Sequence, residues 1–145
     1  MKNTIKHVTK TTVVFLLSIL CILALISCNT VDAEGLWENA TYRRDMSFGK
    51  GANTAVVELE VADEVITFTI KTDKETVGAA LLEHDLIAGE DSAYGLYVKV
   101  VNGITADFDI DQSYWAFHIN GEIAMTGVDS TPIVAGEIYR LTYTK

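Results

Sequence analysis

The sequence has only two cysteines, Cys21 and Cys28, and none after residue 28. The rest of the chain therefore cannot form a disulfide of its own, a zinc–thiolate site or a cysteine nucleophile. It also lacks a glycine-rich phosphate loop, a Gly-x-Ser-x-Gly elbow and a His-Glu-x-x-His helix, which are motifs of common enzyme classes. We therefore expect that the protein is not an enzyme.

The longest apolar run is too short to cross a bilayer. It extends from Thr11 to Ile26, about 16 residues, whereas a spanning helix needs about 20. Lysines precede it and a small residue follows it, which is the order of parts in a secretory signal. The ending Leu25-Ile26-Ser27-Cys28 resembles a bacterial lipobox. This implies that residues 1–27 are a lipoprotein signal peptide and that Cys28 is lipidated. A plain cleaved signal and an uncleaved anchor are the alternatives.

Two acyl chains on Cys28 would give stable attachment to a membrane, where one chain alone is marginal. The expected location is therefore extracytoplasmic, with the protein held on the bacterial membrane by its lipid anchor.

Positive charge is scarce. The chain has 11 Lys and Arg against 20 Asp and Glu, and loss of residues 1–27 removes Lys2, Lys6 and Lys10. The remaining 8 basic residues (11 minus 3) leave a net charge of about −12 (8 minus 20). Such a charge repels nucleic acid and anionic lipid head groups, so we expect no nucleic-acid partner. Calcium or a cationic partner is compatible with it.

Periodicity divides the remaining chain into a tether and a domain. Residues 28–53 have no steady apolar period, and we expect a flexible tether there. Residues 54–61 and 65–71 alternate apolar and polar side chains, which predicts a β-hairpin with one apolar face. The capping-box spacing of Thr72 and Glu75 then predicts a helix of about ten residues.

The second half has strand periodicity again, with Asn-Gly turns at 102–103 and 120–121. A β-hairpin, then one helix, then further antiparallel or mixed strands predicts an α+β fold. A β-grasp-like arrangement fits this order best, and a small sandwich with one decorating helix is the alternative.

Several short motifs follow one another in this half. They are Tyr94-Gly95-Leu96-Tyr97-Val98, Val101-Asn102-Gly103-Ile104, Tyr114-Trp115-Ala116-Phe117, Asn120-Gly121-Glu122 and Gly127-Val128. In this order they resemble the C-terminal β-domain of transcobalamin and intrinsic factor, and more closely the transcobalamin-like domains of bacterial lipoproteins. The resemblance implies that residues 54–145 form a transcobalamin-like β-grasp domain that holds a small soluble ligand, with cobalamin or another corrinoid as the candidate.

In the animal carriers a separate helical barrel forms the second wall of the ligand site, and this sequence contains no such barrel. A corrinoid is too large for a domain of about 90 residues to enclose, given that ligand sites are concave pockets. If the ligand is a corrinoid, we therefore expect either that a second protein completes the site or that the affinity is modest.

The resemblance also implies which positions line the ligand wall. They are Tyr94, Gly95, Tyr97, Tyr114, Trp115, Phe117 and Val128. Aromatic rings offer apolar area, and glycine allows a ligand to approach the backbone. The alternative for Trp115 and Phe117 is packing in the core, because they share a strand face with Ile119. The tyrosines could equally be ordinary half-exposed sheet residues.

Asp107, Asp109 and Asp111 form one acidic cluster. In an extended segment all three carboxylates would project to one side, which would allow a calcium site. Gln112 and His118 stand where an EF-hand loop needs glycine and glutamate, and a solvated acidic loop is the alternative. The second interpretation of function is therefore a surface module that binds calcium, another metal or a protein, without an organic ligand.

Overall fold

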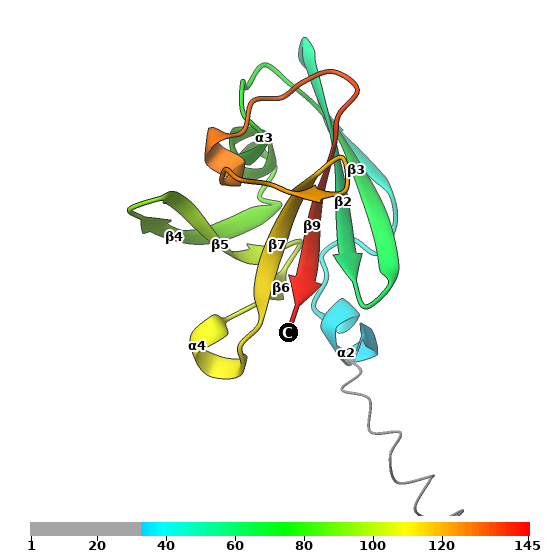
Figure 1. Ribbon diagram of the computed structural model, residues 1–145. Helices are drawn as coiled ribbons and strands as arrows, with labels where there is room; N and C mark the ends of the chain where they lie inside the picture. The colour runs from blue at the N-terminus through cyan, green and yellow to red at the C-terminus, as the bar shows by residue number, and fades with distance from the viewer. Residues whose placement is uncertain (1–32) are drawn as a thin grey trace, which may run out of the picture. The chain divides into compact units, whose positions relative to one another are not determined.

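The computed structural model describes residues 33–145, which lie in one compact unit. The expected signal peptide, Cys28 and residues 28–32 of the expected tether lie outside the described residues. The helices are α2 (Ala33–Glu38), α3 (Val77–Glu83), α4 (Phe108–Asp111) and the 3-10 helix η1 (Val128–Ser130) (Figure 1). Within residues 33–145, no helix has the length and apolar character that crossing a membrane would require.

The strands form two sheets. They are β1 (Met46–Gly49), β2 (Asn53–Val61), β3 (Glu64–Thr72), β4 (Ile87–Ser92), β5 (Gly95–Val101), β6 (Ile104–Thr105), β7 (Tyr114–Ile119), β8 (Glu122–Ile123) and β9 (Ile138–Thr144). One sheet has six strands in the order β1-β3-β2-β9-β7-β8, and the other has three in the order β4-β5-β6.

The six-stranded sheet is built on the predicted hairpin. β2 pairs antiparallel with β3, and the last strand, β9, pairs parallel with β2 and antiparallel with β7. The hairpin, the helix α3 and a final strand parallel to the first give the β-grasp-like order that the periodicity predicts. The α+β fold is therefore confirmed.

The core lies on one face of this sheet because its strands alternate. In β2 the side chains of Val57 and Leu59 are 1% and 0% exposed, and the residues between them are half-buried. Val57 is in register with Phe68 on one side and with Tyr139 on the other, so their side chains share the buried face. Buried residues of α3 and of the three-stranded sheet belong to the same core cluster, and they cover this face as a second layer (Figure 1).

The structure differs from the expected tether over residues 33–53. Trp37 in α2 is only 6% exposed and belongs to the core cluster, and β1 adds a parallel edge strand next to β3. The buried side chain of Asn102 holds the segment between them. Its Oδ1 accepts from the Tyr42 N–H at 2.9 Å, and its Nδ2 donates to the Tyr42 carbonyl at 2.7 Å.

The helix α3 begins later than predicted. Its N-cap is Thr76, whose hydroxyl accepts from the Ala79 N–H at 3.3 Å. Thr72 ends β3 instead, and its hydroxyl accepts from the Lys74 N–H and donates to Glu83. Both threonines can cap a helix, and the pairing of Thr72 in the sheet decides between them.

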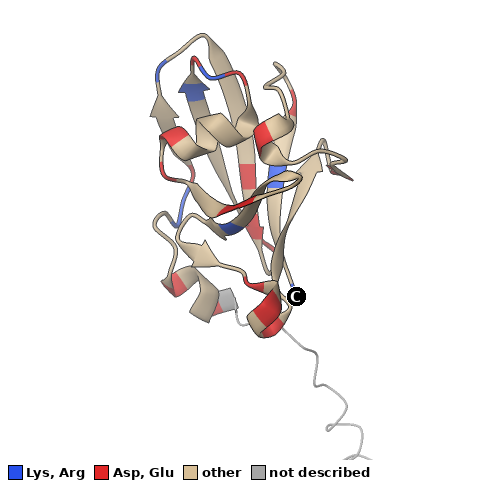
Figure 2. Ribbon diagram, turned by 90° about the vertical axis from the view of Figure 1, so that its left-hand side faces the viewer, with Lys and Arg blue, Asp and Glu red and all other residues tan. Residues whose placement is uncertain are grey.

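Acidic residues are spread along the described part of the chain and are more common there than basic ones (Figure 2). Three cations make most of the ion pairs found among residues 33–145. Lys99 pairs with Glu90 and Asp107, Arg140 with Glu58 and Glu60, and Lys145 with Asp111.

Candidate ligand-binding surface

The positions expected to line a ligand wall lie on two sheets and one short helix. Tyr94, Gly95 and Tyr97 belong to the β4–β5 hairpin, Tyr114, Trp115 and Phe117 to β7, and Val128 to η1. The structure therefore does not assemble them into one continuous wall.

The β7 positions face opposite sides of the six-stranded sheet. Trp115 is 8% exposed and packs edge-on against Tyr143, with ring centroids 5.4 Å apart. Phe117 stacks on Tyr139 at 6.4 Å. Both rings thus lie against the hydrophobic core, whereas Tyr114 projects to the opposite, open face of the strand. Val128 is 3% exposed and is also part of the core.

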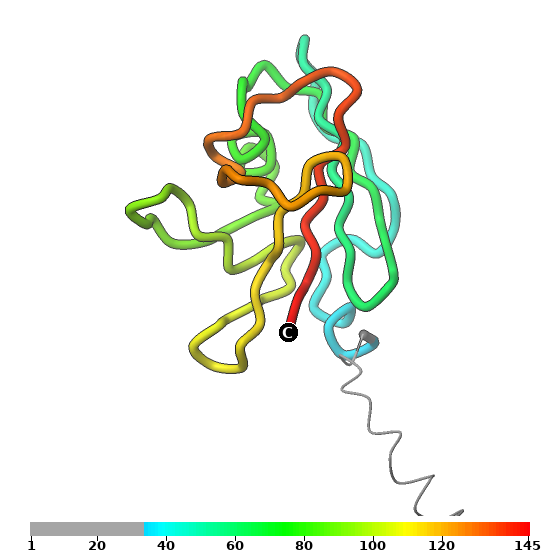
Figure 3. The backbone as a smooth tube through the Cα atoms, in the orientation of Figure 1, coloured from blue at the N-terminus to red at the C-terminus, as the bar shows by residue number. Residues whose placement is uncertain are grey.

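The tip of the β4–β5 hairpin is different, because it presents an aromatic ring to solvent. Tyr94 is 94% exposed, and the tip projects beyond the neighbouring elements (Figure 3). The turn is held by Ser92, whose hydroxyl accepts from the Tyr94 N–H at 3.1 Å and donates to the Gly95 carbonyl at 2.6 Å. The exposed ring therefore stands on a turn with its own hydrogen bonds.

Asp129 braces this hairpin from η1. One carboxylate oxygen accepts from the Leu96 N–H at 3.2 Å. Gly95 has φ +101, and a Cβ there would collide with the same carboxylate. Gly78 of α3 lies close to the backbone of Asp129. A Cβ added at position 78 would be only 2.8 Å from the Asp129 Cα, so the absence of a side chain there lets α3 and η1 approach each other. The positive φ and the neighbouring carboxylate of Asp129 together explain why glycine is needed at position 95.

A second loop meets the hairpin at Tyr94. A Cβ on Gly127 would lie 3.9 Å from the Tyr94 carbonyl oxygen, and Met125, two residues earlier, is 96% exposed. We call Tyr94, Tyr97, Met125 and Asp129 the hairpin-tip surface. The second oxygen of Asp129, Oδ1, is buried and has no hydrogen-bond partner among the described residues.

Sequence reasoning missed Met125 and Asp129. No alternation of apolar and polar residues points to Met125, because the strand before it, β8, has only two residues. The one usable signal for Asp129 is its place directly after the Gly127-Val128 motif.

The acidic cluster is not extended, so its three carboxylates do not project to one side as an extended segment would place them. Asp107 is the N-cap of α4, where Oδ1 accepts from the Asp109 N–H at 3.0 Å and Oδ2 pairs with Lys99 at 3.3 Å. Asp111 accepts from the Ser113 hydroxyl at 2.5 Å and from Lys145 at 2.9 Å. The Ser113 hydrogen bonds, followed by Lys145, lower the pKa of Asp111 to about 2. Across residues 33–145, no group of three or more His, Cys, Asp or Glu could hold a metal ion.

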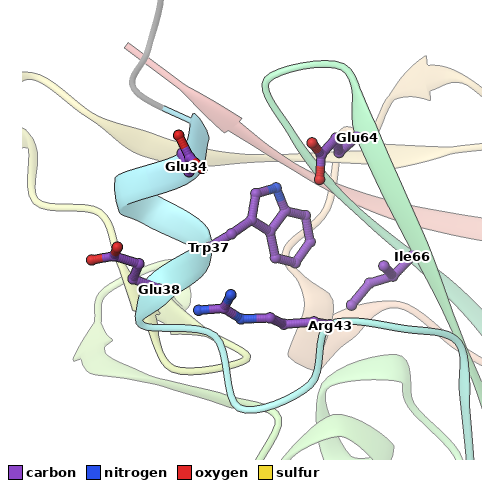
Figure 4. A pocket seen from close by; sticks show the side chains of 6 residues that line it. All are labelled: Glu34, Trp37, Glu38, Arg43, Glu64 and Ile66. Atoms are coloured by element: carbon purple, nitrogen blue, oxygen red, sulfur yellow. The ribbon is translucent and has the colours of Figure 1, made fainter.

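Two cavities lie elsewhere, beside the N-terminal part of the described chain. One, of about 480 Å³, is lined by Glu34, Trp37, Glu38, Arg43, Glu64 and Ile66 (Figure 4). The other, of about 410 Å³, is lined by residues 40–44 and Met46. Neither is lined by the hairpin-tip surface or by the positions that the resemblance implies.

Comparison with solved structures first shows which class of fold the domain has. The chain matches the structure of haptocorrin in complex with Cbi, with a TM-score of 0.53 and 20% identity, over 68% of this chain. It spans about a quarter (26%) of the length of haptocorrin. This likeness shows the fold alone, and the domain has a transcobalamin-like fold.

A second solved structure defines the family. It is a protein from Ruminococcus gnavus described as a "putative metal binding protein", with a TM-score of 0.60 and 30% identity, over 65% of this chain and 98% of that one. The chain belongs to the same family as this protein. Residues 74–145 match the family described as Domain of unknown function (DUF4430). No curated protein matches the sequence.

Proposed function

We propose that the protein is an extracytoplasmic binding protein, anchored through a lipid on Cys28, that presents its transcobalamin-like domain to a small soluble ligand and acts by binding rather than by turnover. The observation that supports this most is the 94% exposure of Tyr94 on a hairpin fixed by Ser92 and Asp129. A rigid aromatic side chain loses little conformational entropy on binding, so such a ring is an efficient contact.

A corrinoid is the ligand that we propose first. The flat macrocycle would stack on the exposed ring of Tyr94, with the exposed side chain of Met125 against its edge. The fold shared with haptocorrin, which was crystallised with Cbi, supports this choice. The hairpin-tip surface covers only one side of such a ligand, so a second protein would complete the site.

Titration of the full chain in detergent with cobalamin, cobinamide and haem tests the proposal, by visible absorbance and calorimetry. We expect Tyr94→Ala to weaken corrinoid binding about tenfold, the equivalent of about 1.4 kcal/mol. Tyr114→Ala is the matched control, because Tyr114 is a partly exposed tyrosine on another sheet. Failure of all three compounds to bind, with and without cell extract, would overturn the corrinoid proposal. Equal weakening by both variants would remove the hairpin-tip surface as the site.

The description of the Ruminococcus gnavus relative favours metal binding as a second candidate function. Because residues 33–145 offer no group of three ligands, a metal would need further ligands from outside this range or from a partner. Thermal melting with calcium and with a chelator tests it. A midpoint that does not change with calcium would contradict a calcium-stabilised module.

The anchor is tested separately. We expect labelled fatty acid to be incorporated into the wild-type chain in bacteria, and Cys28→Ala to lose the label and leave the membrane fraction. Unchanged labelling of Cys28→Ala would contradict lipidation at this residue.

A further inference from the structure

Three exposed apolar side chains gather where α4 meets β7. Phe108 and Ile110 of α4 are 54% and 83% exposed, and Tyr114 at the start of β7 is 40% exposed. The rings of Phe108 and Tyr114 lie edge to face, with their centroids 6.5 Å apart. All three residues are outside the core cluster, so α4 presents apolar surface that the core of the domain does not use. We call these three residues the α4 patch.

The α4 patch lies at the end of the domain where the described chain begins. Figure 1 shows α4, α2 and the C-terminus together at the lower end. Two contacts agree with this placement. The ion pair of Asp111 with Lys145, at 2.9 Å, joins α4 to the C-terminus. Asn102, six residues before α4, holds the segment after α2 through its hydrogen bonds to Tyr42.

This end of the domain is also close in sequence to the proposed anchor. Residues 29–32 alone separate Cys28 from Ala33, the first residue of α2. An extended chain covers at most about 3.6 Å per residue, so Ala33 lies within about 18 Å of a lipidated Cys28. Trp37 of α2 is buried in the core, and α2 therefore cannot peel away to lengthen the tether. Once Cys28 carries its lipid, the end with α2 and α4 stays next to the bilayer.

The charges at this end indicate which kind of lipid surface it can approach. Asp107, the N-cap of α4, and Asp111 both pair with lysines. By contrast, Asp109 of α4 and Glu34 and Glu38 of α2 are exposed and have no ion pair within residues 33–145. Unpaired carboxylates repel anionic head groups, whereas the ammonium group of a zwitterionic head group can pair with them.

We propose that the α4 patch rests on the zwitterionic surface of the membrane that carries the lipid anchor. This inference rests on the lipidation proposed at Cys28 and is independent of the corrinoid. Ile110 and the ring of Phe108 enter the head-group region, where apolar and aromatic side chains are favoured and polar neighbours remain hydrated. The ammonium group of a phosphatidylethanolamine pairs with Asp109. The lipid and the α4 patch together then hold the domain in one orientation on the membrane.

A dye at position 110 tests the contact, because no cysteine follows residue 28 and the lipid blocks the thiol of Cys28. Ile110→Cys in the lipidated protein is labelled with an environment-sensitive dye and reconstituted in vesicles of phosphatidylethanolamine and phosphatidylcholine. We expect the emission to shift to shorter wavelength, and lipids brominated near the head group to quench most of it.

Ile123→Cys is the matched control for this label. Ile123 is also an exposed isoleucine, at 73%, but it lies in β8, which pairs with the end of β7 opposite to Tyr114. The dye at position 123 should emit as in water and should not be quenched by the brominated lipids. Equal quenching at the two positions would overturn the proposal, because the label itself would then be drawn into the bilayer.

The lipid composition tests the choice of a zwitterionic surface. Replacement of the phosphatidylcholine by phosphatidylglycerol should reduce the quenching at position 110, because the unpaired carboxylates repel an anionic surface. Asp109→Asn, added to Ile110→Cys, should restore part of the quenching. Quenching that increases with phosphatidylglycerol would overturn this choice of surface.

Flotation of the wild type with the vesicles separates this inference from the anchor on which it rests. Protein that carries no lipid and does not float overturns both. Protein that floats while the dye at position 110 emits as in water overturns the contact and leaves the anchor standing. A dye at position 110 whose emission is shifted but not quenched by brominated lipid also overturns the membrane contact, because another protein or a second copy of the chain then covers the α4 patch.

Discussion

The carboxylate of Asp129 accepts a hydrogen bond from the Leu96 backbone N–H at 3.2 Å and lies where a side chain at Gly95 would have to be. This contact joins η1 to the β4–β5 hairpin across 33 residues of sequence. It fixes the backbone on which Tyr94 is exposed, so the hairpin-tip surface depends on it.

Gly95→Ala should therefore destabilise the domain more than the same change at Gly121. Both glycines have positive φ, +101 and +84, but a Cβ on Gly121 would meet nothing within 4 Å. Backbone strain alone costs about 1–3 kcal/mol, and the collision with Asp129 should add about 1–3 kcal/mol at Gly95. Urea unfolding of the two variants measures the difference. Equal losses of stability would mean that Asp129 moves away freely and does not brace the hairpin.

Tyr139→Phe should cost about 0.5–1.5 kcal/mol of unfolding free energy, because it removes the hydrogen bonds that the phenol hydroxyl makes to partly buried partners. The hydroxyl of Tyr139 accepts from the Val134 N–H at 2.8 Å and lies 2.9 Å from a Glu137 oxygen, while the ring is 0% exposed. Burial is the main reason that the pKa of this phenol is raised.

Tyr143→Phe is the control for this change, since Tyr143 is also a buried β9 tyrosine but its hydroxyl has no hydrogen bond within residues 33–145. Thermal and urea unfolding should show almost no loss for Tyr143→Phe. A loss at position 143 as large as that at 139 would contradict the role assigned to the Tyr139 hydroxyl.

The strands of the six-stranded sheet could be predicted where their own sequence alternates. Tyr139 and Leu141 are buried in β9 with half-buried residues between them, as the period predicts. β4 could not be found this way, because only Ile87 of its residues is buried. The segment at residues 33–49 was missed for a related reason. Trp37 and Phe48 pack through separate tertiary contacts that leave no local period.

The candidate site was predictable only in part. Tyr94 and Gly95 were singled out by the motif that they share, and they do lie together at an exposed turn. The contact that holds this turn comes from Asp129, in a different part of the sequence. A single sequence contains no record of such long-range neighbours.

Trp37→Ala should cost about 3–5 kcal/mol, as expected when a large buried aromatic side chain is removed. If Trp37 lay in a flexible tether, its removal would cause no such loss of stability. Tyr94→Ala, at a position that is 94% exposed, should change stability by less than about 0.5 kcal/mol. Urea unfolding of both variants compares them. A Trp37→Ala loss as small as that of Tyr94→Ala would show that α2 is not held in the core in solution.

The loss of stability of the domain at acidic pH should depend in part on the carboxylate of Asp111. Its pKa is lowered from 3.8 to about 2, first by the Ser113 hydrogen bonds and then by Lys145. A depressed folded-state pKa adds stability that is present above the unfolded pKa and is lost as the pH falls through the folded one. The melting temperature of the wild type should therefore exceed that of Asp111→Asn above about pH 4, and the difference should vanish between about pH 4 and pH 2.

Asp109→Asn is the matched control for this pH series. Asp109 lies in the same short helix, but its carboxylate has no partner within the described range. Its melting temperature should follow that of the wild type at every pH. Added salt should reduce the Asp111 difference only partly, because it screens Lys145 but leaves the Ser113 hydrogen bonds in place. If Asp109→Asn and Asp111→Asn melt alike from pH 7 to pH 2, the link between Asp111, Ser113 and Lys145 contributes nothing to stability.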